Sequence, residues 1–457
     1  MNESTILATK TFTGSASLAA IGIKLAELKL FEPIAQQVQI AQKTIKDRPS
    51  DKLSDAFISI LAGAHGLVEI NTRLRADVGL QRAFGRSRCA EQSVVQDTLN
   101  ASTAENVKQM EQAIDSIYRQ HGQGYQHDYQ ASFQVLDVDM SGLPCGPKAA
   151  FATKGSFAKQ RNRRGRQLGR VLASQYGEVV VDRLFDGKTQ LTRALQPLLL
   201  AAEETLQLDE DKRRRSIVRV DAGGGSLKDV NWLLARDYLV DGKDYSGQQA
   251  KRLAKSVVDW YADPHQPERQ FGWVTETTEA YVRPVKRIAV RCRQQDGKFA
   301  YGVLISALSA QHVLTLTGQS LSLLEDPPAV LLAYVTFYDR RGGGVETSFK
   351  GDKQGLGRGL RSKKRLAAQQ MVMLLGSLAH NVVVWAHHWL ASPALHHYGT
   401  VRMVRDVFHM SGFLLTDAFG QVVQIVLNQA APLAPALILP LRHLLAGAQV
   451  AVNLGQT

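Results

Sequence analysis

Residues 338–353 read Y-D-R-R-G-G-G-V-E-T-S-F-K-G-D-K and place one carboxylate, Glu346, among several cationic side chains. The glycines at 342–344 favour a tight turn into a helix whose free N–H groups can face an anion. The residues that follow predict this helix, with Glu346, Lys350 and Lys353 at positions i, i+4 and i+7 of one face. An exposed Glu346–Lys350 ion pair of little consequence is the simpler interpretation. A functional interpretation is favoured by two aspartates earlier in the chain.

Both of these aspartates follow apolar strands. The segment F-Q-V-L-D-V-D-M at residues 133–140 alternates as a strand does, with Asp137 and Asp139 on one face. A second short strand, S-I-V-R-V, leads into D-A-G-G-G-S at Asp221. We prefer Asp139 because it lies nearer the end of its strand, and Asp137 is its alternative.

Carboxylates at the ends of adjacent strands converge at one edge of a sheet, where they repel one another unless a cation is bound. Mg²⁺ prefers one or two carboxylates together with phosphate oxygens and water. With Glu346 as the third carboxylate, Asp139 and Asp221 would complete a site for two metal ions. One ion would activate a water or a 3′-hydroxyl, and the other would stabilise the leaving oxygen.

The composition is that of a soluble globular protein. The 457 residues are enough for about two to four domains, with 44% hydrophobic and 21% charged residues. The three cysteines lie far apart without a C-x-x-C motif, which fits a reducing cytoplasm and excludes a disulfide framework or a cysteine zinc site. The N-terminus lacks the order of a signal peptide. The apolar run 371–390 contains histidines and an asparagine and predicts a buried helix rather than a membrane span.

The positive charge is unevenly distributed. The net charge is +13, and residues 1–130 contain 14 basic and 14 acidic residues, so the whole excess lies in residues 131–457. Such a surface favours a polyanionic partner, with general solubility as the alternative. The segment 154–170 contains Arg161, Arg163 and Arg164 and no acidic residue, and it is predicted to be a basic loop.

The order of periodicities predicts an α/β protein with helical ends. The expected regions are a helical, DNA-binding N-terminal domain (1–128), the first part of the α/β core (129–254), a β-strand insertion (255–336), the helices around Glu346 (337–390) and a helical C-terminal region (391–457). In the first region, clustered arginines at 73–88 fit either a DNA-contacting bundle or a plain helical scaffold.

Other common motifs are missing from the sequence. The glycines at 223–225 match neither a P-loop nor G-x-G-x-x-G, and no G-x-S-x-G is present. The histidines between 380 and 397 lie in an apolar helical region without matching ligands, so no metal site is expected there.

At these residues the chain resembles the DDE transposases of bacterial insertion sequences, in the branch with a Tyr-Arg-Glu-Lys signature. Tyr338, Arg341, Glu346 and Lys353 are separated by two, four and six residues, whereas the family has two, three and six. Arg340 is therefore the alternative to Arg341. The order of L-D-V-D-M-S, R-V-D-A-G-G-G, a β insertion and the Glu helix is also similar, over roughly residues 50–430.

The resemblance implies an RNase H-like catalytic core, a mixed sheet flanked by helices, interrupted by the β-rich insertion. It implies that Asp139, Asp221 and Glu346 are catalytic and bind two Mg²⁺ ions, for which Mn²⁺ can substitute. Some relatives flip a base onto an aromatic residue of the insertion. Trp273 is the candidate for that role, with a core tryptophan as the alternative. The expected DNA-binding residues are Tyr338, Arg341, Lys353, Lys350, Arg161, Arg163 and Arg164.

The implied function is that of a transposase that cleaves double-stranded DNA at the terminal inverted repeats and joins the 3′-OH to target DNA. We expect a homodimer on the paired ends, no membrane partner, and a cytoplasmic, nucleoid-associated location in a prokaryote. Two alternatives stay open: an inactive DNA-binding protein derived from a transposase, and an RNase H-like nuclease without strand transfer.

Overall fold

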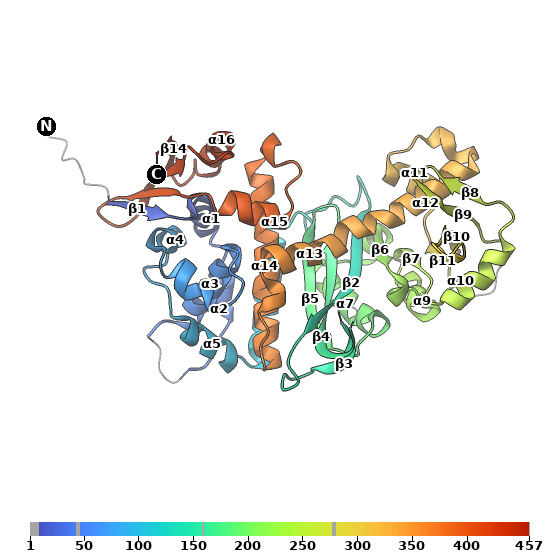
Figure 1. The fold of residues 1–457 in the computed structure, drawn as a ribbon, viewed down its shortest axis with the longest axis horizontal. Helices are drawn as coiled ribbons and strands as arrows, with labels where there is room; N and C mark the ends of the chain where they lie inside the picture. Colours follow the sequence, from blue (N-terminus) through green and yellow to red (C-terminus); the bar gives the residue numbers. More distant parts are fainter. Residues whose placement is uncertain (1–8, 43–45, 158–159, 277–279, 457) are drawn as a thin grey trace.

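The structure is a computed structural model that describes residues 9–42, 46–157, 160–276 and 280–456. One long helix, α14 (Leu366–Leu390), stands between an N-terminal group of helices and a large sheet, and a second long helical run crosses this sheet (Figure 1). The described residues form a ten-stranded and a four-stranded sheet together with many helices, so the prediction of a mixed α/β protein is confirmed.

The N-terminal region is largely helical. Thr103 begins its longest helix with a capping box, in which its side chain accepts from the Asn106 N–H and Asn106 accepts from the Thr103 N–H. Arg86, one of the clustered arginines, is an ion-pair partner of the fully buried Asp55 at 2.9 Å. The helices are α1 (Ala16–Glu27), α2 (Glu32–Gln37), α3 (Pro49–Leu61), α4 (Val78–Ala83), α5 (Gln92–Ala101) and α6 (Ala104–His121).

Five strands of the large sheet, in the order β5-β4-β2-β6-β7, position the candidate site. The first three are antiparallel neighbours, and β2, β6 and β7 run parallel. Every residue of β6 is buried, as expected for a strand covered on both faces. The strands are β2 (Gln134–Pro144), β4 (Gln160–Ala173), β5 (Glu178–Asp186), β6 (Ser216–Val220) and β7 (Leu239–Lys243).

Helices cover both faces of this part of the sheet. The bare backbone of Gly169 accommodates Leu198, whereas the next residue, Arg170, bonds Asp352. Because successive strand residues point to opposite faces, α7 lies on one face and α13 on the other. The helices around the sheet are α7 (Leu191–Leu206), α8 (Glu210–Arg214), α9 (Leu227–Ala235) and α13 (Thr347–Gly355).

The strands predicted for the insertion extend the large sheet instead of forming a sheet of their own. β11 pairs antiparallel with the outer edge of β7, satisfying backbone groups that an edge strand leaves open. The segment 255–336 is also not all strand, because it contains α11 and most of α12. The elements are α10 (Gly247–Leu253), β8 (Tyr261–Asp263), β9 (Gln266–Trp273), β10 (Lys286–Arg293), β11 (Phe299–Ser306), α11 (Ala310–Thr317) and α12 (Pro327–Arg341).

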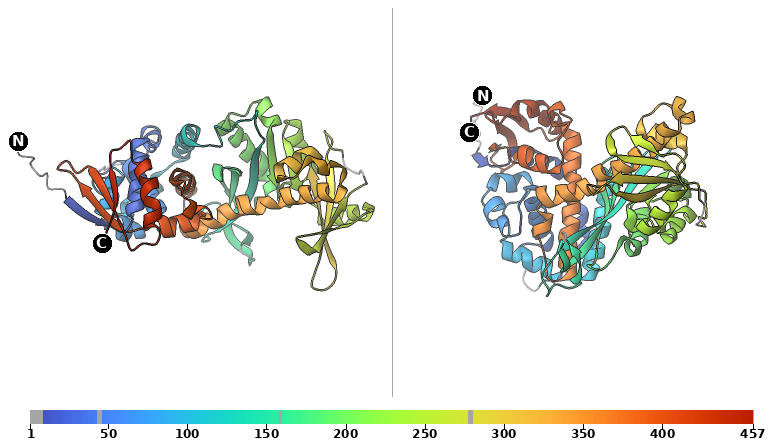
Figure 2. Two further views of the ribbon diagram at one scale, coloured as in Figure 1. Left: turned by 90° about the horizontal axis from the view of Figure 1, so that it is seen from above. Right: turned by 45° about the vertical axis from the view of Figure 1, so that its right-hand side comes forward.

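The predicted glycine turn before Glu346 is wrong. α12 continues through a π-helical turn, Gly342–Glu346, into α13, so the three form one helical run across the sheet (Figure 2). Glycine is needed at position 344, because a Cβ there would overlap the carboxylate of Asp137 on β2. The run therefore packs against the sheet with bare backbone and presents no free helix N-terminus at this point.

Helix α14 is a core helix, as predicted for residues 371–390. By length and composition alone it is apolar enough to cross a membrane, but 89% of its most apolar window is buried inside the protein. It packs against β5, α3, α5 and α6.

The prediction that both ends of the chain are wholly helical is also wrong. β1 (Thr9–Thr13) pairs with β12 (Gly412–Thr416), and β13 (Val422–Asn428) and β14 (Ala451–Gly455) complete the four-stranded sheet. Residues of β12 are alternately buried and half-buried, which is the period of a strand with one covered face. The remaining helices of this region are α15 (Thr400–Arg402) and α16 (Ala434–Leu444).

Candidate active site

Asp139 and Asp221 lie together at one edge of the parallel strands β2 and β6. The last paired residues of these strands are Val138 and Val220, and each aspartate is the next residue in its chain. Both aspartates line a cavity of about 670 Å³. Asp221 accepts a hydrogen bond from the Gly223 N–H at 2.8 Å, which fixes the turn after β6. Two carboxylates from distant parts of the sequence thus face a common space.

The position of Asp139 differs from the prediction in one respect. β2 does not end at Asp139 but continues to Pro144, because its pairing with β4 persists after its pairing with β6 has stopped. Asp139 is therefore in the middle of a strand, at the point where the neighbouring parallel strand gives way to the cavity.

Asp137, the alternative to Asp139, is fully buried and has a structural partner. Its carboxylate accepts two hydrogen bonds from Arg219 of β6, at 2.6 and 2.9 Å, and a third from Ser174. A carboxylate bonded in this way has little capacity left for a ligand. The side chain of Asp139 is 16% exposed and opens on the cavity, so we retain Asp139 as the candidate.

Glu346 is linked to Asp139 through Arg341. The Arg341 guanidinium forms an ion pair with Asp139, Nη2 to Oδ2 at 3.0 Å, and donates a hydrogen bond from Nη1 to Glu346 Oε1 at 3.0 Å. Arg341 is 4% exposed, whereas the side chain of Glu346 is 58% exposed. Arg340, the alternative to Arg341, instead donates to the carbonyl oxygens at the end of α11.

The donor types in this cluster suit Mg²⁺, although their arrangement holds a guanidinium between two of the carboxylates. Within the described residues no group of three or more His, Cys, Asp or Glu side chains is placed so that it could hold a metal ion. The carboxylates are nevertheless close enough to affect each other. Burial raises the pKa of Asp139 to about 6; Arg341 opposes this, and the charges of Asp221 and Glu346 add to it. A cation bound there would relieve this repulsion.

Tyr338 and Lys353 belong to the same cluster. Burial raises the pKa of Tyr338, and Arg341 opposes the shift while Asp221 adds to it. Lys353 lines the acidic cavity, and its ammonium donates to Ser141 Oγ at 2.6 Å. Burial lowers the pKa of Lys353, and nearby guanidinium groups lower it further.

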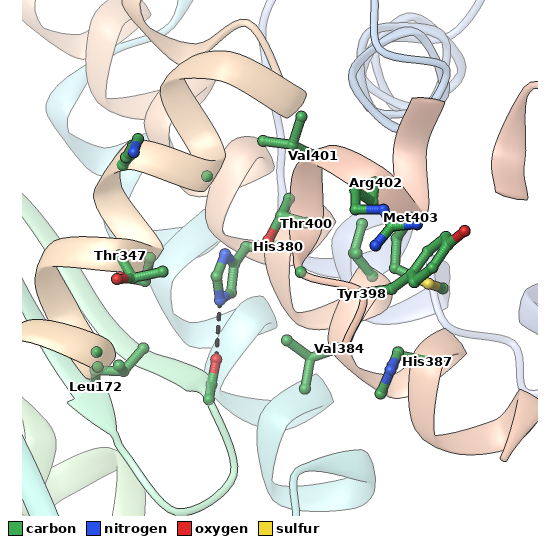
Figure 3. A pocket seen from close by; sticks show the side chains of 18 of the residues that line it. Leu172, Thr347, His380, Val384, His387, Tyr398, Thr400, Val401, Arg402 and Met403 are labelled. Carbon is green, nitrogen blue, oxygen red and sulfur yellow. Dashed lines mark hydrogen bonds between the residues drawn. The ribbon is translucent and has the colours of Figure 1, made fainter. Parts of the chain in front are cut away.

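Lys350 does not join these residues. It is exposed and lines a second cavity, between α13, α14 and residues 398–403 (Figure 3). Among the described ion pairs, Glu346 is paired with Arg341 rather than with Lys350, so the predicted i, i+4 pair does not form. Glu346 and Lys350 therefore lie on the same helical run, but Glu346 contacts Arg341 whereas Lys350 lines the second cavity.

The basic segment 154–170 is a hairpin, not the predicted loop. β3 (Thr153–Phe157) pairs with the first part of β4. Arg163 and Arg164 are exposed on this hairpin, and Arg164 donates to the Ala152 carbonyl oxygen at 2.9 Å. The side chain of Arg161 lies outside the described residues. Further along β4, Arg166 and Arg170 point inward and are buried.

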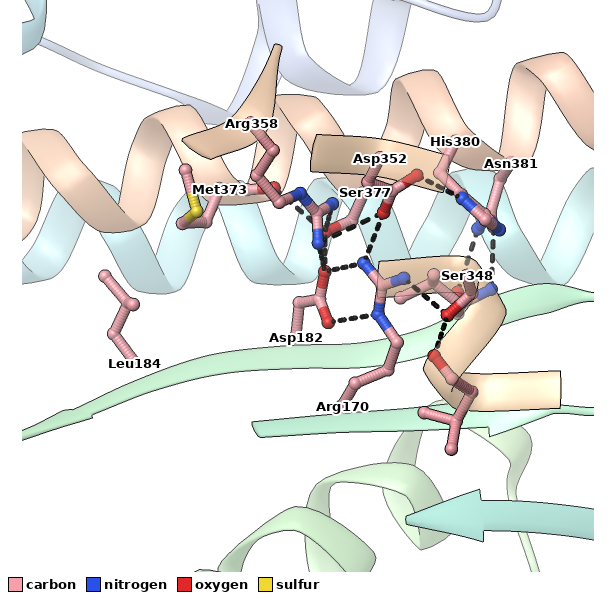
Figure 4. A network of polar contacts seen from close by, with 12 residues as sticks. Arg170, Asp182, Leu184, Ser348, Asp352, Arg358, Met373, Ser377, His380 and Asn381 are labelled. Carbon is pink, nitrogen blue, oxygen red and sulfur yellow. Dashed lines mark hydrogen bonds and ion pairs between the residues drawn. The ribbon is translucent and has the colours of Figure 1, made fainter. Parts of the chain in front are cut away.

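Arg170 is the centre of a buried charge network that holds α13 on the sheet (Figure 4). Its guanidinium contacts Asp182 on β5 at 2.7 Å and Asp352 on α13 at 2.8 Å. Arg358 contacts the same two carboxylates, and His380 of α14 contacts Asp352 at 2.6 Å. Arg170 is also the cross-strand partner of Asp139. The network therefore fixes the helix that carries Lys353 close to the acidic cavity.

Sequence reasoning missed several residues that line the acidic cavity, among them Thr189, Gln190 and Tyr245. Thr189 and Gln190 follow β5, and Tyr245 follows β7. Their position just after these strands is the one sequence signal that could have placed them at the edge of the sheet. Ser141, which holds Lys353, was also missed, although it follows Asp139 by two residues. Trp273 is half-buried and packs edge-on against Tyr334, at 5.6 Å between ring centroids.

Comparisons with known proteins give little to add to this geometry. No family model matches the chain, and no curated protein matches it. It is similar to one chain of a solved structure described as a piggyBac transposase synaptic complex with hairpin DNA, determined by cryo-EM. The two are 12% identical, the similarity covers 88% of this chain and 82% of that one, and the TM-score is 0.44. A TM-score below 0.5 is too low to assign a shared fold, so the function has to be inferred from the site itself.

Proposed function

We propose that the protein is a DDE transposase that cleaves the ends of its DNA element and joins the freed 3′-OH to target DNA. The observation that supports this most is the placement of Asp139 and Asp221 side by side on one cavity, with Glu346 linked to Asp139 through Arg341. These are the three acids of the sequence resemblance, and they come from three elements far apart in the chain.

On this proposal, Asp139, Asp221 and Glu346 would hold two Mg²⁺ or Mn²⁺ ions, which activate the attacking oxygen and stabilise the leaving one. Before metal binding, Arg341 keeps Asp139 and Glu346 near each other and favours the ionised form of Asp139. Burial is the main cause of the raised pKa of Asp139, and the charges of Asp221 and Glu346 add to it, so a bound cation would favour the ionised form of this carboxylate.

The cationic side chains around the cavity would hold the DNA backbone. Lys353 is at the cavity wall and Tyr338 lies near Arg341, so both suit contact with phosphates beside the cut. Arg163 and Arg164 on the exposed hairpin suit non-specific contact with the flanking duplex, which is salt-dependent. We propose Arg161 as a further contact of the same kind, and we assign Lys350 to the second cavity instead.

The wider assignments are proposals that rest on the same resemblance. They are an RNase H-like core built on the mixed sheet, a homodimer on the paired DNA ends, and action at the nucleoid of a prokaryotic cell. In a dimer the two acidic cavities would each process one end of the element. The oligomeric state on DNA can be measured by light scattering with duplexes that carry the terminal repeats.

One assay distinguishes the transposase from its two alternatives. The full-length protein is incubated with labelled duplexes that carry the inverted repeats flanking its gene, with Mg²⁺ or with EDTA, and with a target plasmid. A transposase nicks the ends and joins them to the plasmid in a metal-dependent manner. A nuclease without strand transfer cuts and never joins. A protein that binds the repeats without cutting them in Mg²⁺ or Mn²⁺ contradicts the proposal and supports an inactive descendant.

A further inference from the structure

The second cavity, on the far side of α13 from the acids, has the size and chemistry of a binding site. Its volume is about 390 Å³, within the range of small-molecule pockets. Lys350 and Gln354 of α13 line it, whereas Lys353 of the same helix lines the acidic cavity, so α13 separates the two. Tyr398 and Arg402 line the opposite side (Figure 3).

Part of the wall of this cavity is apolar. Leu172 of β4, Val384 of α14, and Val401 and Met403 of the segment 398–403 line it (Figure 3). Several glycines expose bare backbone at the same surface, which allows a planar group to approach closely. Such a surface suits a heterocyclic ring.

The charged side chains of the cavity are all cationic or potentially so. None of its lining residues in the described part of the chain is Asp or Glu. Lys350 is exposed, and its ammonium is free to reach an anion at the rim. Arg402 lies over the Tyr398 ring, 3.7 Å from its centroid, with Asp406 at 3.5 Å as its ion-pair partner. Because Arg402 already has an anionic partner, an anionic ligand group is favoured at the Lys350 side of the cavity.

Two histidines of α14 line the cavity, but they differ in whether a ring nitrogen is left to bond a ligand. His380 contacts an acceptor with each ring nitrogen, Asp352 Oδ1 at 2.6 Å and the Gly177 carbonyl oxygen at 2.9 Å, so it has no group left for a ligand. Within the part of the chain that the structure describes, the one hydrogen bond of His387 joins its Nε2 to the Leu395 carbonyl oxygen at 2.9 Å. A nitrogen that bonds a carbonyl carries the hydrogen, so Nδ1 of the neutral His387 ring is an acceptor.

We propose that this cavity binds a nucleotide, with its base against the apolar wall and its phosphate at Lys350. His387 Nδ1 would accept a hydrogen bond from an N–H of the base or an O–H of the sugar. The ligand is either a free nucleotide or an unpaired nucleotide of a DNA strand, because both present the same chemistry. The proposal does not depend on DNA cleavage, since binding is measured without any reaction.

Calorimetric titration of the full-length protein tests this proposal. The probes are thymidine 5′-monophosphate, thymidine, inorganic phosphate and a short single-stranded oligothymidylate. The mononucleotide should bind at least about tenfold more tightly than either of its parts, because both ends of the cavity contribute. Tighter binding of the oligonucleotide identifies a DNA strand as the natural ligand, and equal binding identifies a free nucleotide. Phosphate that binds as tightly as the mononucleotide overturns the proposal.

Two lysines on one helix provide the matched control. Lys350→Ala should weaken mononucleotide binding about tenfold, the loss of one charge-assisted hydrogen bond. Lys353→Ala, three residues away but facing the acidic cavity, should leave the affinity unchanged, as should the exposed Lys251→Ala on α10. Equal effects of Lys350→Ala and Lys353→Ala would place the nucleotide in the acidic cavity and reject the site.

A blocking variant tests the cavity itself without removing charge. Gly399 lines the cavity, has a φ of −88°, and a Cβ there would meet nothing within 4 Å. Gly399→Phe is therefore compatible with the backbone and should abolish mononucleotide binding by filling the space. The melting temperature should stay at the wild-type value, which shows that the fold is intact. Unchanged affinity in a folded Gly399→Phe protein contradicts the proposal.

Discussion

Removal of the Asp352 carboxylate should destabilise the protein strongly, because this group is the point at which α13 is tied to the rest of the fold. Its oxygens contact Arg170 at 2.8 Å, Arg358 at 3.3 Å and His380 at 2.6 Å, and all four side chains are at most 3% exposed. In Asp352→Ala, the guanidinium groups of Arg170 and Arg358 share Asp182 as their one remaining carboxylate partner among the described residues. Buried cations then lack part of their compensating charge.

The expected loss of unfolding free energy is about 3–5 kcal/mol, the usual cost of removing one partner from a buried ion pair. Urea unfolding followed by circular dichroism, with the wild type and variant compared at the same pH, measures it. The control is Asp211→Ala, because Asp211 also faces an arginine, Arg214 at 3.4 Å, but its side chain is 93% exposed. The unfolding midpoint of this control should match that of the wild type.

The same prediction has a pH dependence. Burial alone would raise the pKa of Asp352, but the opposing charges of His380, Arg358 and Arg170 outweigh it and hold the pKa below its usual range. The stabilisation is thus present above the ordinary carboxyl pKa of about 4 and disappears as the pH falls below it. The difference in unfolding free energy between the wild type and Asp352→Ala should therefore become smaller as the pH falls below about 4. A loss below about 1 kcal/mol at pH 7 would refute the role of the network.

Three further predictions concern Asp139, the helical run beside Asp137, and Arg341. The pKa of Asp139 is raised to about 6, so its ionisation costs stability above that pH. The contribution of Asp139 to the free energy of unfolding should rise as the pH falls from 7 to 5. The free energy of unfolding of Asp139→Asn, measured by urea unfolding at each pH, should lack this contribution. Gly344→Ala should cost about 1–3 kcal/mol, since its Cβ would overlap Asp137, whereas Gly343→Ala has open space and should be neutral or slightly stabilising in the same unfolding assay. Arg341→Gln removes the cation beside Asp139, so the Asp139 titration measured by NMR should move to higher pH; an unchanged titration would show that the ion pair is absent in solution.

The two aspartates were predictable because their signals are local. Each follows an apolar run, and the parallel pairing of β2 with β6 ends directly before both of them, which brings them to one edge. The choice between Asp137 and Asp139 needed the structure. Both lie on the same face of β2. Asp137 is bonded to Arg219, and Arg219 comes from the neighbouring strand β6. No pattern within β2 itself reveals this pairing.

The triple glycine was misleading because its role is tertiary. Gly342, Gly343 and Gly344 would favour a turn in an isolated peptide. In the protein, the helical run continues through them, because the packing of α12 and α13 on the sheet requires bare backbone beside Asp137. The turn propensity of the glycines is overridden by the contact of Gly344 with Asp137, about 200 residues earlier in the sequence.

The basic segment was misjudged for a related reason. A run of arginines without acids resembles a solvated loop, yet Arg166 and Arg170 are buried in β4. The acids that pair with Arg170 are on β5 and α13, so no local charge pattern reveals them. The C-terminal strands were a different case, because the residues of β12, G-F-L-L-T, show no polar–apolar alternation and its partner β1 comes from the other end of the chain.

The central claim is that Asp139, Asp221 and Glu346 act together in cutting DNA, and strand cleavage by single variants tests it most directly. Duplexes carrying the flanking inverted repeats are incubated with Mg²⁺ and the wild type, Asp139→Ala, Asp221→Ala or Glu346→Gln, and DNA binding is measured in parallel. We predict that every variant binds the repeats and that none cleaves them above the background seen in EDTA. Cleavage at the wild-type rate by any one of them would remove that residue from the site and contradict the account.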